Sequence, residues 1–286
     1  MLGIIGGTGL YDMEALEDRE SVRVDTPFGP PSDDILTGVL AGSRLAFLPR
    51  HGRGHRLLPS EVNSRANIWA LKKLGVDSLV SVSAVGSLRE DIAPGDLVLP
   101  DQFIDRTWGR ESTFFGDGLV AHVAFGDPVC GQLSARVSAA AEAGSARIHR
   151  GGTYVCIQGP AFSTRAESRL FRSWGGDVVG MTNLPEARLA REAELCFATL
   201  ALATDYDCWR EEEAAVDAGS IMEVLAANAA VARDVVARVA GSYDPRPGCD
   251  CQRVLDTALV SDRSMAPAET NEKLALLLER VDREAS

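Results

Sequence analysis

The chain has 286 residues, of which 45% are hydrophobic and 24% are charged, and its formal net charge is -12 at pH 7. This composition is that of a folded globular protein and excludes a disordered or low-complexity chain. The acidic balance argues against a nucleic-acid partner, which would need clustered lysine and arginine side chains. Any anion that binds must therefore be held by a local cluster.

The N-terminal segment lacks the basic stretch, the long apolar run and the cleavage site of a secretory signal. No run of about 18 apolar residues, the length that spans a membrane, occurs in the chain. We therefore expect a cytoplasmic protein with no membrane partner. The length would allow two domains, but a single α/β domain of this size is ordinary, and we expect one.

Short apolar runs typical of buried strands alternate with longer helical patterns. The predicted strands are Leu2–Ile5, Leu45–Leu48, Leu79–Ser83, Tyr154–Ile157 and Phe197–Ala203. Their nearly continuous hydrophobicity predicts a sheet that is covered on both faces. The alternation of strands and helices therefore predicts an α/β sandwich.

Apolar residues at helical spacing mark the segments between and after these strands. The predicted helices are Ser64–Leu74, Val129–Ala143, Arg165–Trp174, Glu186–Ala193, Ser220–Gly241 and Asn271–Val281. Ser220 and Glu223 have the spacing of a capping box, and Gly241 ends that pattern. Residues 243–286 are thus expected to form a connection and a helical extension of the single domain.

Glycines follow the first predicted strand, in the segment Gly6–Gly9. Small residues let backbone N–H groups approach an anion, and the hydroxyl of Thr8 adds a donor. Asp12 stands where a dinucleotide fingerprint has its third glycine, and no P-loop lysine follows. The segment is therefore either an anion loop or a tight turn without a ligand.

Two arginines and two histidines crowd into Pro49–His55, after the second predicted strand. Cations on a flexible loop at the carboxyl end of a strand suit an oxyanion site, here through Arg50 and His51. A solvated basic loop is the alternative. The concentration of histidines there, in so acidic a chain, favours the site.

Two further segments gain meaning only beside the others. Ser83 and Ala84 end the third predicted strand, where they offer a hydroxyl and N–H groups to an anion or form a bare turn. Phe162 precedes a predicted helix start. Its ring can stack on a flat heterocycle, but from the residues alone a core anchor is preferred.

Two carboxylates, Asp205 and Asp207, end the most hydrophobic predicted strand. In extended geometry both side chains would point to the same face. Facing one cleft, they can accept hydrogen bonds from an exocyclic amine, and one can act as a general acid if its pKa is raised. A solvated acidic turn is the alternative, which fits the neighbouring Tyr206 and Trp209 poorly.

The cysteines are mostly read as small buried thiols. Four of the six are dispersed along the chain, namely Cys130, Cys156, Cys196 and Cys208. Cys249 and Cys251 are separated by one residue and form two ordinary thiols, a redox pair or a tight disulfide. A zinc site would need a second pair or a histidine, and none is near in the sequence. We therefore expect no metal.

Together these motifs resemble the methylthioadenosine phosphorylases, within the trimeric purine nucleoside phosphorylase family, from Gly3 to about Tyr243. Besides the loops above, the resemblance is carried by Gly86–Arg89, Asp101–Thr107, Gly159–Ser163, Met181–Glu186 and Ala203–Trp209. It implies a mixed central sheet flanked by helices, a homotrimer, and cofactor-free cleavage of an adenine nucleoside by inorganic phosphate. The implied substrate is a 5′-substituted adenosine such as 5′-methylthioadenosine, and the products are adenine and the 5-substituted ribose 1-phosphate.

The resemblance also implies roles for individual residues. Phosphate binding is implied for Thr8, Arg50, His51, Ser83 and Ala84. Nucleoside binding is implied for Phe162, Ser163, Met181, Thr182, Asp205 and Asp207, and for His122 of a neighbouring subunit. The apolar wall around the 5′ group is implied for Ala218, Ile221 and Met222. Asp205 is assigned as the general acid at N7 and Asp207 as the acceptor from the N6 amino group, although the two roles can be exchanged.

Two positions depart from the mammalian pattern, and four other functions stay open. Val82 replaces a hydroxylated residue, and Gly180 stands in place of an asparagine. A phosphorylase of 6-oxopurine nucleosides would carry an amide at Asp205, and a dinucleotide-dependent oxidoreductase would need the missing glycine. The motifs do not distinguish the implied function from two others. These are a phosphorylase of another 5′-modified or unmodified purine nucleoside and a nucleoside-binding protein without activity.

Overall fold

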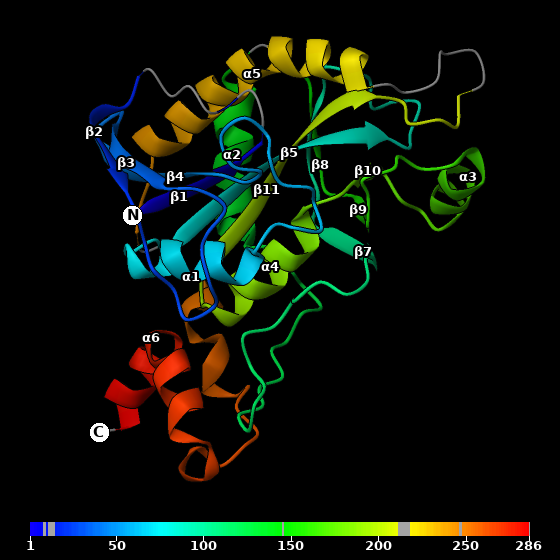
Figure 1. The fold of residues 1–286 in the computed structure, drawn as a ribbon. Coiled ribbons are helices and arrows are strands. Elements are labelled where there is room, and N and C mark those ends of the chain that lie inside the picture. The colour runs from blue at the N-terminus through cyan, green and yellow to red at the C-terminus, as the bar shows by residue number, and fades with distance from the viewer. Residues whose placement is uncertain (8–9, 11–14, 145, 211–217, 246–247, 286) are drawn as a thin grey trace.

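The computed structural model describes residues 1–7, 10, 15–144, 146–210, 218–245 and 248–285, with the side chains of residues 218–223, 225–227 and 285 left undescribed. The chain forms an α/β sandwich in which a twisted mixed sheet lies between helices (Figure 1). The predicted fold class is confirmed.

The sheet is centred on β5, which pairs with β1, β10 and β11. Its strands are β1 (Leu2–Gly6), β2 (Glu17–Val22), β3 (Ile35–Leu40), β4 (Ser43–Pro49), β5 (Ser78–Ser87), β6 (Leu97–Leu99), β7 (Gln102–Arg106), β8 (Ile148–Arg150), β9 (Thr153–Ile157), β10 (Val178–Gly180) and β11 (Cys196–Asp205). β5 pairs in parallel with β1 and β11, and its last residues pair antiparallel with β10. One path runs β2-β3-β4-β1-β5-β10-β9-β7, and β11 leads from β5 to β6 and β8.

The predicted strands correspond to β1, β4, β5, β9 and β11, whose inner residues are buried. Apart from β3, which lies between β2 and β4, the strands that the sequence did not predict are short or lie at an edge. β2, for example, has the sequence EDRESV and exposes nearly every residue. Hydrophobic runs indicate burial, so an exposed edge strand is not detected from them.

Two pairs of helices cover the two faces of the sheet (Figure 1). α1 (Ser64–Lys73) and α4 (Asn183–Glu192) pack in one core layer, and α2 (Gly131–Glu142) and α5 (Ala218–Gly241) pack in the other. α3 (Arg165–Ser173) lies beyond β9 and β10. All the predicted helices occur, with ends shifted by a few residues.

A capping box is observed at a helix where none was predicted. Thr164 accepts from the backbone of Glu167, and the Glu167 side chain accepts from the backbone of Thr164, so that the first turn of α3 is fixed. The box predicted at Ser220 and Glu223 lies outside the described side chains, and α5 begins at Ala218.

The C-terminal segment forms a compact extension at one end of the molecule (Figure 1). It contains η1 (Asp250–Asp256), η2 (Arg263–Met265) and α6 (Ala268–Ala285). Arg280 of α6 forms a salt bridge of 2.6 Å with the buried Glu194, which precedes β11. Among the described residues, no helix is long and apolar enough to cross a membrane.

Candidate active site

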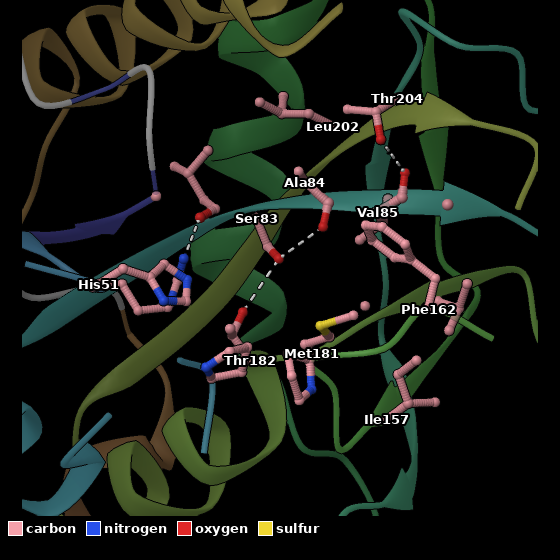
Figure 2. Close-up of a pocket in the computed structure, with 18 of the residues that line it drawn as sticks. His51, Ser83, Ala84, Val85, Ile157, Phe162, Met181, Thr182, Leu202 and Thr204 are labelled. Atoms are coloured by element: carbon pink, nitrogen blue, oxygen red, sulfur yellow. Dashed lines mark hydrogen bonds between the residues drawn. The ribbon is translucent and has the colours of Figure 1, made fainter. Parts of the chain in front are cut away.

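A cavity of about 490 Å³ opens where β1, β4, β5 and β11 reach their carboxyl ends (Figure 2). Ligands gather at this edge of parallel strands because the loops there are free to vary. Ten of the predicted site residues line the cavity, namely Arg50, His51, Ser83, Ala84, Phe162, Ser163, Met181, Thr182, Asp205 and Asp207. Segments as distant as the loops after β4 and β11 therefore contribute to one site.

The remaining predicted residues are not placed at this cavity. Thr8 lies outside the described residues, although its neighbour Gly7 lines the cavity. The side chains of Ala218, Ile221 and Met222 are not described either. His122 is exposed, does not line the cavity, and is held by its backbone N–H, which donates to the Ala258 carbonyl at 2.8 Å. Its predicted action in a neighbouring subunit stays a prediction.

Arg50 lines the cavity but is almost fully buried, with 1% of its surface exposed. Its Nε lies 2.5 Å and its Nη2 3.1 Å from the two carboxylate oxygens of Glu186. Nη2 also donates to Ser81 Oγ at 2.7 Å, and Nη1 donates to the Val82 carbonyl at 2.9 Å. The guanidinium is thus fixed in place by the sheet and by α4 before any ligand arrives.

Glu186 is the functional residue that sequence reasoning missed. It lies in the first turn of α4, is 1% exposed, and also accepts from Ser81 Oγ at 2.6 Å. The motif that contains Glu186 was noted, but its partner Arg50 lies 136 residues away. A buried glutamate requires a cation or donors, yet the sequence does not say which.

His51 is held as a neutral ring. Its Nδ1 lies 2.9 Å from the Leu57 carbonyl oxygen, so Nδ1 carries the hydrogen and donates it. His55 stacks on His51, with the ring centroids 4.4 Å apart. Burial and the charge of Arg50 lower the pKa of His51 to about 4. At pH 7 the remaining nitrogen, Nε2, is therefore a hydrogen-bond acceptor.

The Ser83 hydroxyl lies within hydrogen-bond distance of two other hydroxyls, and Figure 2 shows the contact with Thr182. Its Oγ lies 3.4 Å from Thr182 Oγ1 and 3.3 Å from the hydroxyl of Tyr154. Thr182 is the N-cap residue of α4 but forms no side-chain cap, so the helix begins at the cavity wall with its cap hydroxyl turned to Ser83. A helix N-terminus favours an anion because its first N–H groups are unpaired within the helix.

Gly180 has a physical explanation in the same group. A Cβ atom at this position would lie 2.0 Å from the Tyr154 hydroxyl, so only glycine leaves room for the tyrosine. Tyr154 is fully buried and its hydroxyl reaches Ser83. The departure from asparagine at Gly180 is thus matched by the tyrosine of β9.

Asp205 ends β11 and Asp207 follows it, but the two do not share an extended backbone. The register shifts between Ala203 and Asp205, and Asp207 has a φ of 51° in the left-handed region. The expected extended geometry is therefore wrong, because the chain turns at the end of the strand. Both carboxylates still line the cavity, and the Asp207 N–H donates to Asp205 Oδ1 at 2.7 Å.

The environments of the two carboxylates differ. Asp205 also accepts from the Thr204 hydroxyl at 2.7 Å, so donors face both of its oxygens. Oδ2 of Asp207 is buried without a hydrogen-bond partner of good geometry among the described residues. Burial raises the pKa of Asp207, the nearby Ser168 hydroxyl opposes this, and the charge of Asp205 adds to it. Asp207 therefore retains a proton more readily than an ordinary aspartate does.

The wall beside Asp207 combines the Ser163 hydroxyl with an exposed ring, and Ser168 is buried near it without lining the cavity. The hydroxyls of Ser163 and Ser168 are buried and, like Asp207 Oδ2, have no partner of good geometry in the described part of the chain. Phe162 lines the cavity and is 44% exposed, so the core position preferred from the residues alone is wrong. An exposed aromatic face beside unsatisfied polar atoms suits a flat heterocycle.

The cysteines are arranged differently from the sequence expectation. The thiols of Cys130 and Cys196 lie beside those of Cys249 and Cys251, so the second pair that seemed to be missing is present in space. Cys156 and Cys208 are not part of this group, and none of the six cysteines forms a disulfide.

Comparisons with known proteins agree with this site. A family model described as the phosphorylase superfamily matches residues 1–240. The S-methyl-5′-thioadenosine phosphorylase of Geobacter sulfurreducens is 56% identical over 279 residues, which cover 97% of this chain and 98% of that protein. The protein of the same name from Koribacter versatilis is 54% identical over 277 residues, covering 97% and 95%.

Two solved structures extend the comparison to three dimensions. A methylthioadenosine phosphorylase sourced from an antarctic soil metagenomic library superposes with a TM-score of 0.90 at 51% identity, covering 97% of this chain and 98% of that chain. The methylthioadenosine phosphorylase from Schistosoma mansoni in complex with adenine has a TM-score of 0.80 at 35% identity, covering 97% of each chain. The chain therefore belongs to the phosphorylase superfamily and, within it, to the family of the methylthioadenosine phosphorylases.

Proposed function

We propose that this protein cleaves the N-glycosidic bond of 5′-methylthioadenosine with inorganic phosphate, giving adenine and 5-methylthioribose 1-phosphate. The observation that carries the proposal is one cavity with two contrasting halves. The anion half consists of Arg50, His51, Ser83 and Thr182, and the base half consists of Phe162, Ser163, Asp205 and Asp207. The space between them accommodates the sugar, whose C1′ must meet phosphate on one side and release the base on the other.

Phosphate is held in the anion half by donors that are already fixed. Arg50 supplies the positive charge, Ser83 and Thr182 supply hydroxyls, and the N-terminus of α4 faces the same space. His51 is neutral, so its Nε2 serves as the acceptor for the P–OH group of hydrogen phosphate. Holding phosphate below C1′ removes much of the entropic barrier to attack. Ala84 and Thr8 are further proposed contacts, through their backbone and the Thr8 hydroxyl.

The base half receives adenine and supplies the proton that the leaving base needs. Phe162 stacks on the ring, while Met181, between the two halves, contacts the ribose. We assign Asp207 as the general acid at N7, because its raised pKa lets it carry a proton at a higher pH than an ordinary aspartate. Asp205 then accepts a hydrogen bond from the N6 amino group. It also orients Asp207 by accepting a hydrogen bond from the Asp207 backbone N–H. This exchanges the two roles inferred from the sequence.

The reaction needs no cofactor, because phosphate is the nucleophile and the protein's own groups hold it and protonate the base. We further propose a cytoplasmic homotrimer in which His122 of each subunit completes a neighbour's 5′ pocket together with Ala218, Ile221 and Met222. A heterologous contact of that kind closes naturally into a ring. A fully active monomer in light scattering would argue against the trimer.

The decisive assay measures adenine release from a panel of 5′-substituted adenosines, with and without phosphate. We expect release only with phosphate, and the highest kcat/KM for the 5′-methylthio substrate. Equal activity on adenosine would make the protein a broader purine nucleoside phosphorylase. Binding without release of adenine would identify a nucleoside-binding protein instead.

A further inference from the structure

Four cysteines converge at the end of β11 opposite to the active site. Cys196 begins β11, Cys130 is the N-cap of α2, Cys249 is the N-cap of η1, and Cys251 lies in the first turn of η1. Their four Sγ atoms all lie within 4.8 Å of one another. The Sγ of Cys249 is 3.6 Å from that of Cys130 and 3.4 Å from that of Cys196.

This spacing matches a tetrahedral metal–thiolate site. Zinc–sulfur bonds of about 2.3 Å place the sulfur atoms of a tetrahedron roughly 3.8 Å apart. The cluster therefore needs only small side-chain adjustments to surround one ion. All four cysteines are free thiols, and three of them are buried, as in a closed structural site.

The surroundings support ligation by thiolates. The Leu133 N–H at the start of α2 donates to the Sγ of Cys130 at 3.5 Å, and backbone N–H donors of this kind stabilise metal-bound sulfur. The Cys-x-Cys pair brings two ligands from one short turn, and the other two come from the rigid starts of a strand and a helix. Three separate parts of the chain thus meet at one point.

We propose that Cys130, Cys196, Cys249 and Cys251 bind one Zn²⁺ ion, which fastens the C-terminal extension to the sheet. This reverses the expectation of no metal, which rested on the absence of a second cysteine pair. The role is structural, because the ten residues of β11 place Cys196 roughly 30 Å from Asp205. The ion stabilises the fold and takes no part in the chemistry of the cavity.

The first test measures zinc in the full-length protein, expressed in zinc-supplemented medium and purified under reducing conditions. We expect one zinc per chain in the wild type and in Cys156→Ala, the matched control for a buried cysteine outside the cluster. We expect less than a tenth of that in Cys196→Ser and in the double variant Cys249→Ser/Cys251→Ser. The melting temperature should fall on chelation in the wild type and return with Zn²⁺.

A second measurement does not depend on the variants folding. Cobalt added to the chelated wild type should give the charge-transfer band and the intense visible bands of tetrahedral Co²⁺–thiolate, and Zn²⁺ should abolish them. The proposal would be overturned if the purified protein contains no metal, its thiols are freely alkylated, and added cobalt gives no thiolate spectrum. A mass lower by four hydrogens in freshly purified protein would overturn it in favour of two disulfides. Adenine release is measured in parallel, so failure here is distinguishable from failure of the proposed reaction.

Discussion

The two halves of the cavity differ in how well their polar groups are satisfied without a ligand. In the anion half, Arg50 is already held by hydrogen bonds to Glu186, Ser81 and the Val82 carbonyl. In the base half, Asp207 Oδ2 and the Ser163 hydroxyl are buried without partners of good geometry among the described residues. The key cation of one half is thus fixed by the fold, whereas buried polar atoms of the other half await a partner from the ligand.

This difference separates stability from function. A buried polar group that is hydrogen-bonded within the protein is compatible with a stable fold. Removing it leaves its former partner buried and unbonded, which lowers the free energy of unfolding. A buried polar group without a hydrogen-bond partner lowers the free energy of unfolding. Binding sites contain such groups because the ligand supplies the missing partner. Substitutions in the anion half should therefore damage both folding and binding, whereas substitutions at Asp207 should damage catalysis alone.

The largest effect is expected for Arg50→Ala. It leaves Glu186 buried without its cation, which should lower the free energy of unfolding by about 3–5 kcal/mol. The variant that folds should show a much larger rise in KM for phosphate than for the nucleoside, since Arg50 contacts only one reactant. Denaturant unfolding and initial rates measure the two effects.

A double variant separates these two consequences. Arg50→Met/Glu186→Met replaces the ion pair with apolar side chains of similar size, which should restore much of the stability. Phosphate-dependent activity should stay low. If the double variant recovers activity together with stability, Arg50 is a structural residue and not a phosphate ligand.

Asp207→Asn is expected to have the next largest effect, on rate alone. Loss of the general acid should lower kcat/KM for the adenine nucleoside by roughly 10²–10⁴. The free energy of unfolding at neutral pH should stay constant or rise, because a buried carboxylate is removed. Asp205→Asn is the matched control, and we expect it to weaken the preference for adenosine over inosine with a smaller loss of rate. A larger loss in Asp205→Asn would reverse the assignment.

The pH dependence follows from the same carboxyl group. Because the pKa of Asp207 is raised, its protonated form persists to higher pH than in an ordinary aspartate, and kcat should fall as the pH rises through that pKa. Asp207→Asn should lack this fall. A profile that keeps the same alkaline limb in the variant would assign the limb to another group.

His51 should produce a pH effect on stability in the anion half. Its folded pKa of about 4 lies below the unfolded value of about 6.5, so the unfolded chain takes up the proton first as the pH falls. As the pH falls from about 6.5 to about 4, the free energy of unfolding should therefore drop by about 3 kcal/mol. Below pH 4 this group should cause no further change. The difference between wild type and His51→Gln in denaturant unfolding isolates the effect, and a constant difference across this range would contradict it.

The smallest effect is expected for Tyr154→Phe, which removes the tyrosine hydroxyl that contacts Ser83 Oγ. We expect a loss of about 1 kcal/mol, seen as a several-fold higher KM for phosphate with little change in kcat. Tyr243→Phe is the control, because the Tyr243 hydroxyl contacts Asp77 and the N-terminus, away from the cavity. Equal kinetic effects of the two substitutions would show that Tyr154 does not position Ser83.

The sequence by itself determined the buried strands, the helices and most of the cavity. β1, β4, β5, β9 and β11 are recognisable because hydrophobic runs report local burial. Polar residues that line the cavity lie in the last part of β5, at the end of β11 and in the loops after β4 and β11. Since parallel strands bring their carboxyl ends to one edge, the loops could be expected to meet there.

Only the tertiary structure decided which distant groups pair. The partner of Arg50, the tyrosine that fills the space at Gly180, and the meeting of Cys130 with Cys249 all depend on the order of strands in the sheet. The turn that separates the environments of Asp205 and Asp207 likewise depends on where β11 leaves β5. Local patterns record whether a residue is buried, whereas its partner and its pKa are set by groups that the fold brings from elsewhere.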